Sequence, residues 1–178
     1  PLIAEYLVFR QKLERALKAA TRESEIARTR KGEMPQREMD VPVLYETNDG
    51  VGVITLNNPE KSNPLSLEVL RGLVDAFRES AAGGDVCVIY RAEGKNFTFG
   101  ADLKHGYRLI TDPELKNEAV ADLWTWQELT TAMLDHPGVI IVGYHGWIVG
   151  GGFEHTLAAD LRVAADDTKI MMPELDLG

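Results

Sequence analysis

The sequence predicts an α/β protein, because segments with strand character alternate with segments of helical character from about residue 41 onward. Two observations carry this prediction. The runs Val86-Cys87-Val88-Ile89-Tyr90 and Val139-Ile140-Ile141-Val142 are short and continuously apolar, which is typical of buried strands. The stretch between them contains a predicted helix, so that strand, helix and strand alternate as in an α/β protein.

The first 40 residues differ from the rest and predict a separate N-terminal extension. Apolar residues recur at spacings of three and four, at Leu2, Tyr6, Phe9, Leu13, Leu17 and Ala20. This pattern indicates an amphipathic helix to about residue 30. Residues 31–40 contain Gly32 and Pro35 and show neither helical nor strand periodicity, so we expect a linker. The predicted domains are therefore 1–40 and 41–178.

A hairpin is expected to open the second domain. Residues 43–46 and 51–56 have strand character, and Asn48-Asp49-Gly50 between them suits a turn with positive φ. Ser66 can cap a helix with apolar residues at Leu67, Leu70, Leu73, Val74 and Phe77, which we expect to end before Gly83-Gly84. The buried strand at 86–91 follows.

The second half predicts further alternation. A small-residue loop at 97–103 leads into a short helix, and Asp112-Pro113 opens a long helix to about Asp135, where His136-Pro137-Gly138 interrupts it. After the strand at 139–142, Gly150-Gly151-Gly152 introduces a helix expected to reach Asp160. Short strands are expected at 161–164 and 169–172.

Composition excludes several classes of function. The 178 residues carry 19 Lys and Arg against 28 Asp and Glu, a net charge of -9, which argues against a generic nucleic-acid or anionic-membrane binder. The longest apolar stretch, 138–153, is shorter than a membrane span and contains His145. The single Cys87 lies in an apolar run and is expected to be buried, which fits a reducing, cytoplasmic location.

Two loops could present backbone N–H groups to an anion. Residues 97–103 and the glycine run 150–152 each precede a helix, where unpaired N–H groups and the helix dipole act together on an oxyanion or phosphate. An ordinary tight turn is the alternative for the first loop, and close helix packing is the alternative for the second. Neither loop has the dinucleotide-binding or Walker pattern.

Glu154 and Glu174 are the candidate acid and base groups. Both lie in segments that we expect to be buried, and buried carboxylates suit proton transfer at neutral pH. The alternative for each is a capping or ion-paired carboxylate. No metal site is predicted, because His145 and His155 lack zinc-site spacing, and His145 is expected to be a structural hydrogen-bonding residue.

Four segments together resemble the crotonase (enoyl-CoA hydratase/isomerase) superfamily. They are, in order, 56–65 (LNNPEKSNPL), 97–103 (FTFGADL), 145–154 (HGWIVGGGFE) and 173–178 (PELDLG). The resemblance covers about residues 41–178 and implies a spiral of ββα units that binds an acyl-CoA thioester. It also implies that the family domain continues, so that 41–178 is expected to be incomplete at its C-terminus.

The resemblance assigns roles to residues of this chain. The backbone N–H groups of Ala101 and Gly151 would form an oxyanion hole for the thioester enolate. The CoA path would be lined by the following residues: Lys61, Ser62, Pro64, Phe99, Asp102, Leu103 and Gly150. Lys104 is a further local cation for the nucleotide. Coenzyme A enters as part of the substrate, and no separate cofactor is expected.

Glu154 and Glu174 match the places of the two glutamates of family hydratases. The resemblance therefore implies addition of water to a 2-enoyl-CoA by an enzyme that forms a trimer or dimer of trimers. The alternatives are a carbon-carbon bond hydrolase or isomerase on the same fold, and a catalytically silent scaffold subunit. Glu60, His155 and the bulky Trp147-Ile148 depart from the usual pattern and favour an unusual acyl group. His155 stands where a leucine is usual, so we expect a polar group beside Glu154.

Overall fold

The computed structural model describes residues 41–177, so the predicted N-terminal helix and linker lie outside the described residues. The bounds of the strands are as follows: β1 Val43–Asn48, β2 Val51–Leu56, β3 Cys87–Ala92, β4 Val139–Tyr144, β5 Trp147–Val149, β6 Leu161–Ala164 and β7 Lys169–Met171. The α-helices are α2 Leu67–Gly83, α3 Leu103–Thr111, α4 Lys116–Leu134, α5 Gly151–Glu154 and α6 Glu174–Leu177. Short 3₁₀ helices are η2 Pro59–Lys61, η3 Pro113–Leu115 and η4 His155–Ala158.

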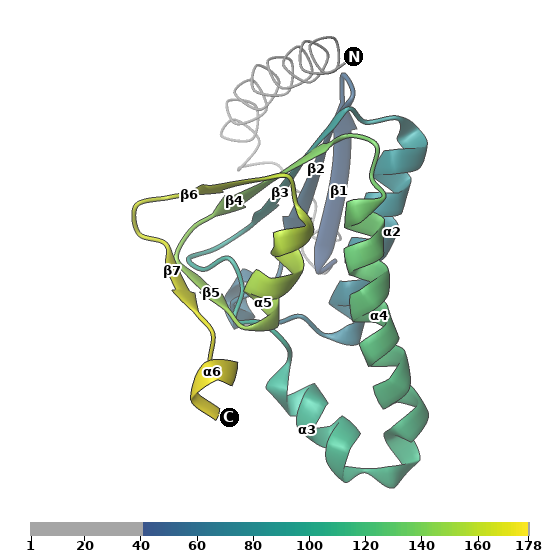
Figure 1. Cartoon of the computed structure of the whole chain (residues 1–178), viewed down its shortest axis with the longest axis vertical. Helices are drawn as coiled ribbons and strands as arrows, with labels where there is room; N and C mark the ends of the chain where they lie inside the picture. Colours follow the sequence, from purple (N-terminus) through teal and green to yellow (C-terminus); the bar gives the residue numbers. More distant parts are fainter. Residues whose placement is uncertain (1–40, 178) are drawn as a thin grey trace.

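A five-stranded sheet in the order β1-β2-β3-β4-β6 is the main layer (Figure 1). The β1–β2 pair is antiparallel, and each later neighbour in the sheet is parallel. The strands β5 and β7 pair in parallel as a second, smaller sheet. The order strand, strand, helix recurs as β1-β2-α2, β4-β5-α5 and β6-β7-α6, which is the expected repetition of ββα units.

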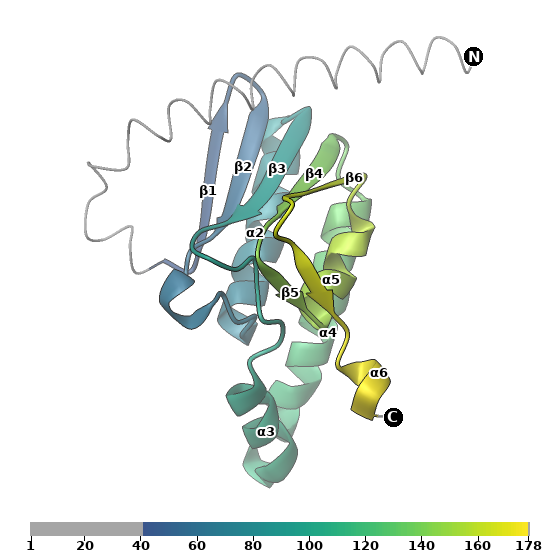
Figure 2. The same cartoon turned by 90° about the vertical axis from the view of Figure 1, so that its left-hand side faces the viewer.

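Helices α2 and α4 lie together along one face of the main sheet (Figures 1 and 2). Their apolar side chains meet those of the central strands in one core, whose fully buried members include Phe77, Tyr90, Phe97, Leu129, Ile140 and Ile148. The ring of Tyr90 packs edge to face against two other rings. Its centroid lies 5.8 Å from that of Phe77 and 5.3 Å from that of Phe97. Packing in this core fixes the strands, and the loops of the candidate site follow the ends of those strands.

The helix signals of the sequence act largely as expected. The Ser66 side chain accepts a hydrogen bond from the Val69 N–H, and Gly84 ends α2 in the left-handed region at φ 79°, so the helix includes Gly83. Asp112 accepts from the Glu114 N–H and Pro113 begins η3, but the regular helix starts only at Lys116. The expected single helix from 113 is therefore a 3₁₀ turn followed by α4.

Two predictions for the second half need correction. The helix after the glycine run is α-helical only through Glu154 and continues as η4 to Ala158, rather than as one helix to Asp160. Three successive glycines give it a weak start, because glycine is among the poorest helix formers. The strand β5 was not predicted, since three residues between His145-Gly146 and Gly150 give too short a periodic pattern.

Candidate active site

The loop after β2 is held in shape by Asn63. Its side chain is 1% exposed, and its Nδ2 group donates to the carbonyls of Glu93, Asn96 and Phe97 at 2.9–3.1 Å. Its Oδ1 accepts from the Asn58 N–H at 2.8 Å. Ser62 and Asn63 both have positive φ, at 59° and 52°. Asparagine tolerates that conformation better than most residues, so this side chain suits the turn as well as the cross-links.

The loop 97–102 is hydrogen-bonded to that turn along its whole length. The Phe99 N–H donates to the Ser62 carbonyl at 3.1 Å, and the Leu65 N–H donates to the Gly100 carbonyl at 2.8 Å. The Asp102 N–H donates to the Leu65 carbonyl at 3.2 Å. Two segments separated by more than 30 residues in the sequence thus form one rigid unit.

The same loop pairs on its other side with the segment that leads to the glycine run. The Thr98 N–H donates to the Trp147 carbonyl at 3.2 Å, and the Val149 N–H donates to the Thr98 carbonyl at 3.1 Å. The approach is closest at Gly100, where an added side-chain carbon would lie 2.5 Å from the Val149 carbonyl oxygen. Gly100 has φ 81°, so both its conformation and its contact require glycine.

This pairing brings Ala101 and Gly151 together with their N–H groups unused. Gly100 and Asp102, on either side of Ala101, are both bonded to Leu65, while no described residue accepts from the Ala101 N–H. Gly151 is the first residue of α5, and likewise its N–H has no acceptor within residues 41–177. Unpaired donors at a helix start and a neighbouring turn are the arrangement that stabilises a developing oxyanion.

Glu174 lies against the glycine run. Gly150 has φ 49°, and a side-chain carbon there would lie 2.5 Å from Glu174 Oε1. The Gly150 N–H donates to the Met171 carbonyl at 2.9 Å, which ties the turn to β7 just before α6 begins. The second sheet therefore places the Glu174 carboxylate against Gly150, one residue before the unpaired Gly151 N–H.

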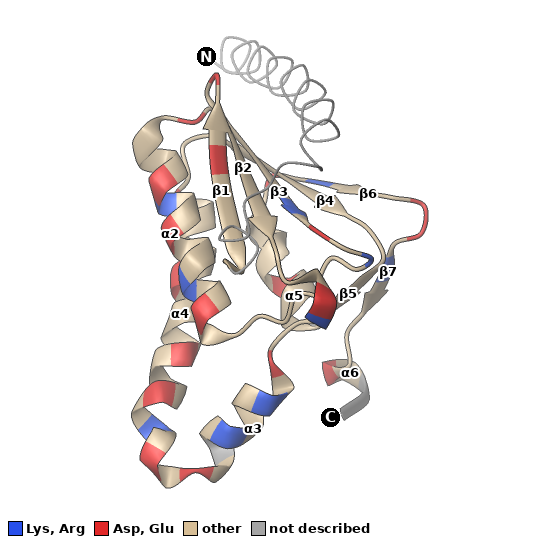
Figure 3. Ribbon diagram, turned by 180° about the vertical axis from the view of Figure 1, so that it is seen from behind, with Lys and Arg blue, Asp and Glu red and all other residues tan. Residues whose placement is uncertain are grey.

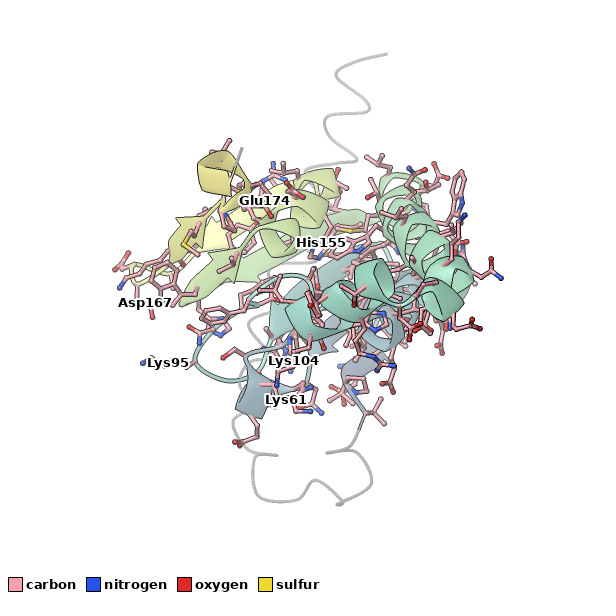
Figure 4. All side chains as sticks on the ribbon, turned by 90° about the horizontal axis from the view of Figure 1, so that it is seen from below. Lys61, Lys95, Lys104, His155, Asp167 and Glu174 are labelled. Atoms are coloured by element: carbon pink, nitrogen blue, oxygen red, sulfur yellow. The ribbon has the colours of Figure 1, made fainter. Side chains whose placement is uncertain are left out.

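His155 is a site neighbour that sequence reasoning did not place correctly. It departs from the family pattern, and we expected a polar group beside Glu154, but the ring is buried and points into the protein (Figure 4). Its Nδ1 lies 2.8 Å from the Gly151 carbonyl oxygen and its Nε2 lies 3.1 Å from the Tyr90 hydroxyl. Burial lowers the pKa of His155 from 6.5 to about 4, so the ring is neutral at pH 7.

The sequence predicted no metal site and a structural, hydrogen-bonding role for His145. Among residues 41–177, no group of three or more His, Cys, Asp or Glu side chains is arranged to hold a metal ion. His145 Nε2 lies 3.2 Å from the Gly94 carbonyl oxygen, so it is a structural hydrogen-bonding residue as expected.

Cys87 is fully buried, and burial raises the pKa of its thiol to about 11.

Comparison with known proteins now connects this geometry to a family. A family model described as "Enoyl-CoA hydratase/isomerase" matches residues 46–178. This chain belongs to the enoyl-CoA hydratase/isomerase family. Within that family, it is 32% identical over 144 residues to hydroxycinnamoyl-CoA hydratase-lyase of Pseudomonas fluorescens, covering 76% of this chain and 50% of that protein.

Two further enoyl-CoA hydratase/isomerase relatives show the range of named activities and the fold. Ethylmalonyl-CoA decarboxylase of Pongo abelii is 28% identical, over 76% of this chain and 44% of that protein. The crystal structure of enoyl-CoA hydratase from Thermoplasma volcanium GSS1 superposes with a TM-score of 0.69 at 27% identity, covering 79% of this chain and 55% of that one. The chain thus spans about half the length of these relatives.

The two glutamates expected from the family resemblance are placed differently from the sequence prediction. Both side chains are exposed, whereas we expected buried segments. Glu154 is the last residue of the short α5, and Glu174 begins α6, beyond the end of β7. No element among residues 41–177 covers either carboxylate.

The residues expected to line the CoA path gather around η2 and the start of α3. Lys61 and Phe99 are exposed, Ser62 and Pro64 are half-buried, and Leu103 is 83% exposed. The half-buried Asp102 caps α3, because its side chain accepts from the N–H groups of Lys104 and His105. Figure 4 labels Lys61 and Lys104 at the same end of that view, and the hydrogen bonds between loops 62–65 and 97–102 agree with that placement.

Charge on the helices around the site is uneven (Figure 3). The helix α3 carries Lys104 and Arg108, whereas the charged positions of α4 are mostly acidic. The basic residues therefore lie on the helix that starts directly after the unpaired Ala101 N–H.

In the described part of the chain, no helix combines the length and apolar content that a membrane span requires.

Proposed function

We propose that this protein is an acyl-CoA enzyme of the enoyl-CoA hydratase type, which adds water across the C2–C3 bond of a 2-enoyl-CoA or eliminates it. The observation that carries the proposal is the pair of unpaired backbone N–H groups at Ala101 and Gly151 on hydrogen-bonded loops. These donors would receive the thioester oxygen as it becomes an enolate oxyanion. The family membership supports a thioester as the ligand.

The two glutamates complete the proposed reaction. One carboxylate accepts a proton from water as the water oxygen bonds to C3, and the electron pair of the C2–C3 double bond moves toward the thioester oxygen. The enolate then collapses as C2 takes a proton from the other glutamate, which begins as the carboxylic acid. The proton that the first carboxylate took from water restores that acid after product release, so that one water is consumed and no proton is lost. The position of Glu174 beside Gly150 supports its part in this reaction.

The nucleotide end of the substrate would lie near η2 and α3. Lys61 and Lys104 are exposed cations there, and the peptide groups of Ser62, Pro64, Phe99, Asp102, Leu103 and Gly150 would line the path of the pantetheine. The proposal includes a cytoplasmic location, a homo-oligomer that is a trimer or dimer of trimers, and no cofactor beyond the CoA of the substrate. Light scattering on the purified protein measures the oligomeric state.

The decisive experiment compares Glu154→Gln with a matched surface change, Glu79→Gln on the exposed side of α2. We expect Glu154→Gln to abolish hydration of crotonyl-CoA, followed by loss of the conjugated thioester absorbance, while acetyl-CoA still binds in isothermal titration. Glu79→Gln should hydrate crotonyl-CoA at the wild-type rate. Unchanged turnover in Glu154→Gln contradicts the assignment, and absence of acetyl-CoA binding in the wild type favours a scaffold.

Carbon-carbon bond cleavage is the second candidate. Relatives named hydratase-lyase and decarboxylase support it, because an oxyanion hole serves any reaction that passes through an enolate. Free CoA separates a CoA-dependent enzyme from a hydrolase of CoA-free diketones. Competitive inhibition by CoA is expected for the former, and indifference to CoA is expected for the latter.

A further inference from the structure

The buried His155 connects the central sheet to Gly151, the first residue of α5. His155 is 4% exposed and lies between the Tyr90 hydroxyl, which comes from β3, and the Gly151 carbonyl, which comes from α5. Tyr90 is itself fully buried and packs against Phe77 and Phe97. The ring therefore bridges the aromatic part of the core and the glycine turn.

The chemistry of the two partners determines which ring nitrogen carries the hydrogen. A carbonyl oxygen can only accept, so Nδ1 of His155 must donate to Gly151 at 2.8 Å. Nε2 of a neutral ring is then the acceptor, and the Tyr90 hydroxyl donates to it at 3.1 Å. Burial lowers the pKa of His155 to about 4, which keeps the ring in this neutral form at pH 7.

The glycine run needs such an external contact. Residues 150–152 have no side chains, so packing of their own side chains cannot fix the orientation of their peptide planes. Backbone hydrogen bonds of α5 hold part of the turn, because the Gly150 carbonyl accepts from the Phe153 and Glu154 N–H groups and the Gly151 carbonyl accepts from the His155 backbone N–H. The other described contacts come from its surroundings. The Gly150 N–H is bonded to Met171, the Gly151 carbonyl is bonded to His155, and the Trp126 ring lies close to the Cα of Gly151.

We infer that His155 is a positioning residue: its ring anchors the Gly151 carbonyl, which limits rotation of the Gly151 backbone and so keeps the N–H on the other side of that Cα pointing at the thioester oxygen. The inference rests on the proposed function, since it assigns His155 to the support of the oxyanion hole. His155 does not touch the substrate; it acts through Gly151. Tyr90 supports the same role, because its hydroxyl stabilises the His155 tautomer in which Nδ1 donates to the Gly151 carbonyl.

Three variants separate this role from simple core packing. In His155→Asn, the side-chain amide nitrogen lies as many bonds from the backbone as Nδ1 and can still donate to Gly151. His155→Leu fills the space but cannot donate. Tyr144→Phe is the control, because Tyr144 is a buried tyrosine whose hydroxyl lies 2.6 Å from Thr156 Oγ1 and is bonded neither to the His155 ring nor to Gly151.

The readout is the infrared carbonyl stretch of ¹³C-labelled butyryl-CoA, which binds but cannot be hydrated. In the wild type the bound carbonyl band should shift to lower wavenumber, and Tyr144→Phe and His155→Asn should keep that shift. His155→Leu should lose half of it or more, with a dissociation constant within about threefold of the wild type. Crotonyl-CoA turnover should fall about ten- to a hundredfold in kcat in His155→Leu, with KM little changed.

The outcomes distinguish this inference from the proposed function. A full carbonyl shift in both the wild type and His155→Leu overturns the positioning role and leaves the oxyanion hole intact. A wild type that does not bind butyryl-CoA, or binds it without a shift, overturns both. Should His155→Leu unfold, as judged by circular dichroism, Tyr90→Phe replaces it: a smaller shift than in Tyr144→Phe supports the inference, and equal shifts overturn it.

Discussion

The Val149 N–H donates a hydrogen bond to the Thr98 carbonyl oxygen at 3.1 Å, although the two residues are 51 positions apart in the sequence. This bond joins the loop that ends in Ala101 to the strand that ends in the glycine run. Both unpaired N–H groups of the candidate site depend on it, because each follows one partner by two or three residues.

Asn63 is the side chain that holds the two loops before Ala101 together. Replacing it with Ala leaves several buried carbonyls without their donor, so we expect the free energy of unfolding to fall by about 2–4 kcal/mol. Chemical denaturation measures that change. Lys61→Ala, two positions earlier and exposed, should alter stability by less than about 0.5 kcal/mol. Equal stabilities for the two variants would show that the amide network contributes little.

Gly150 tests the contact between the glycine run and Glu174. An added methyl group at φ 49° meets the Glu174 carboxylate, so Gly150→Ala should displace that group and reduce crotonyl-CoA hydration about a hundredfold or more. Gly106→Ala is the matched control, because nothing lies within 4 Å of its added carbon and it sits inside α3. The control should retain turnover. Wild-type turnover in Gly150→Ala would show that neither the turn nor Glu174 is needed in this position.

The buried neutral state of His155 predicts a pH dependence of stability. Above pH 6.5 the ring is neutral in both folded and unfolded chains and contributes nothing to the pH dependence. Between pH 6.5 and about 4 the unfolded chain takes up a proton that the folded protein refuses, so stability falls with acidification. The total loss is about 3 kcal/mol.

His155→Asn removes that titration and leaves the carboxylates unchanged. Denaturation curves at pH 7, 6, 5 and 4 should therefore show a smaller loss of stability in His155→Asn than in the wild type. Parallel losses in the two proteins would mean that His155 titrates normally and is accessible to solvent.

Asp85 forms a second buried network, at the opposite end of β3 from the candidate site. Its carboxylate accepts from the hydroxyls of Tyr45, Thr47 and Ser80 at 2.6–2.7 Å. Burial and the neighbouring Asp85 raise the pKa of Tyr45. Asp85→Ala should reduce the free energy of unfolding by about 2 kcal/mol, since the buried Ser80 hydroxyl and the less buried hydroxyls of Tyr45 and Thr47 lose their acceptor.

The same variant should hydrate crotonyl-CoA with nearly wild-type kcat and KM below its unfolding temperature, because the network lies away from the loops. Asp75→Ala, an exposed change on α2, is the stability control. A large loss of kcat in folded Asp85→Ala would connect the two ends of the sheet.

Most of the fold could be predicted from local patterns. The strand β2 and helix α2 have clear apolar periodicity, and Ser66 and Gly84 mark the helix ends with side-chain and backbone chemistry that acts locally. The strand β5 could not, because it has three residues and its partner β7 begins 20 residues after β5 ends. Pairings of that kind depend on tertiary contacts, which the periodicity of a single segment does not contain.

The candidate site divides in the same way. Ala101, Gly151 and the two glutamates were predicted from motifs, since their neighbours in sequence form recognisable loops, and their roles stay predictions. Asn63 and Tyr90 were not found as supporting groups, because their partners lie 30 to 65 positions away. His155 was noticed as unusual but placed on the wrong side: its ring points inward because the Tyr90 hydroxyl and the Gly151 carbonyl satisfy both nitrogens there.

The proposed function requires that the backbone N–H groups of Ala101 and Gly151 together receive the thioester oxygen. A crystal structure of the protein with butyryl-CoA tests it most directly. The proposal predicts the thioester oxygen at about 2.7–3.1 Å from both backbone nitrogens, with Glu154 and Glu174 on either side of C2 and C3. A bound thioester whose oxygen lies away from these two N–H groups, or contacts neither, would contradict it.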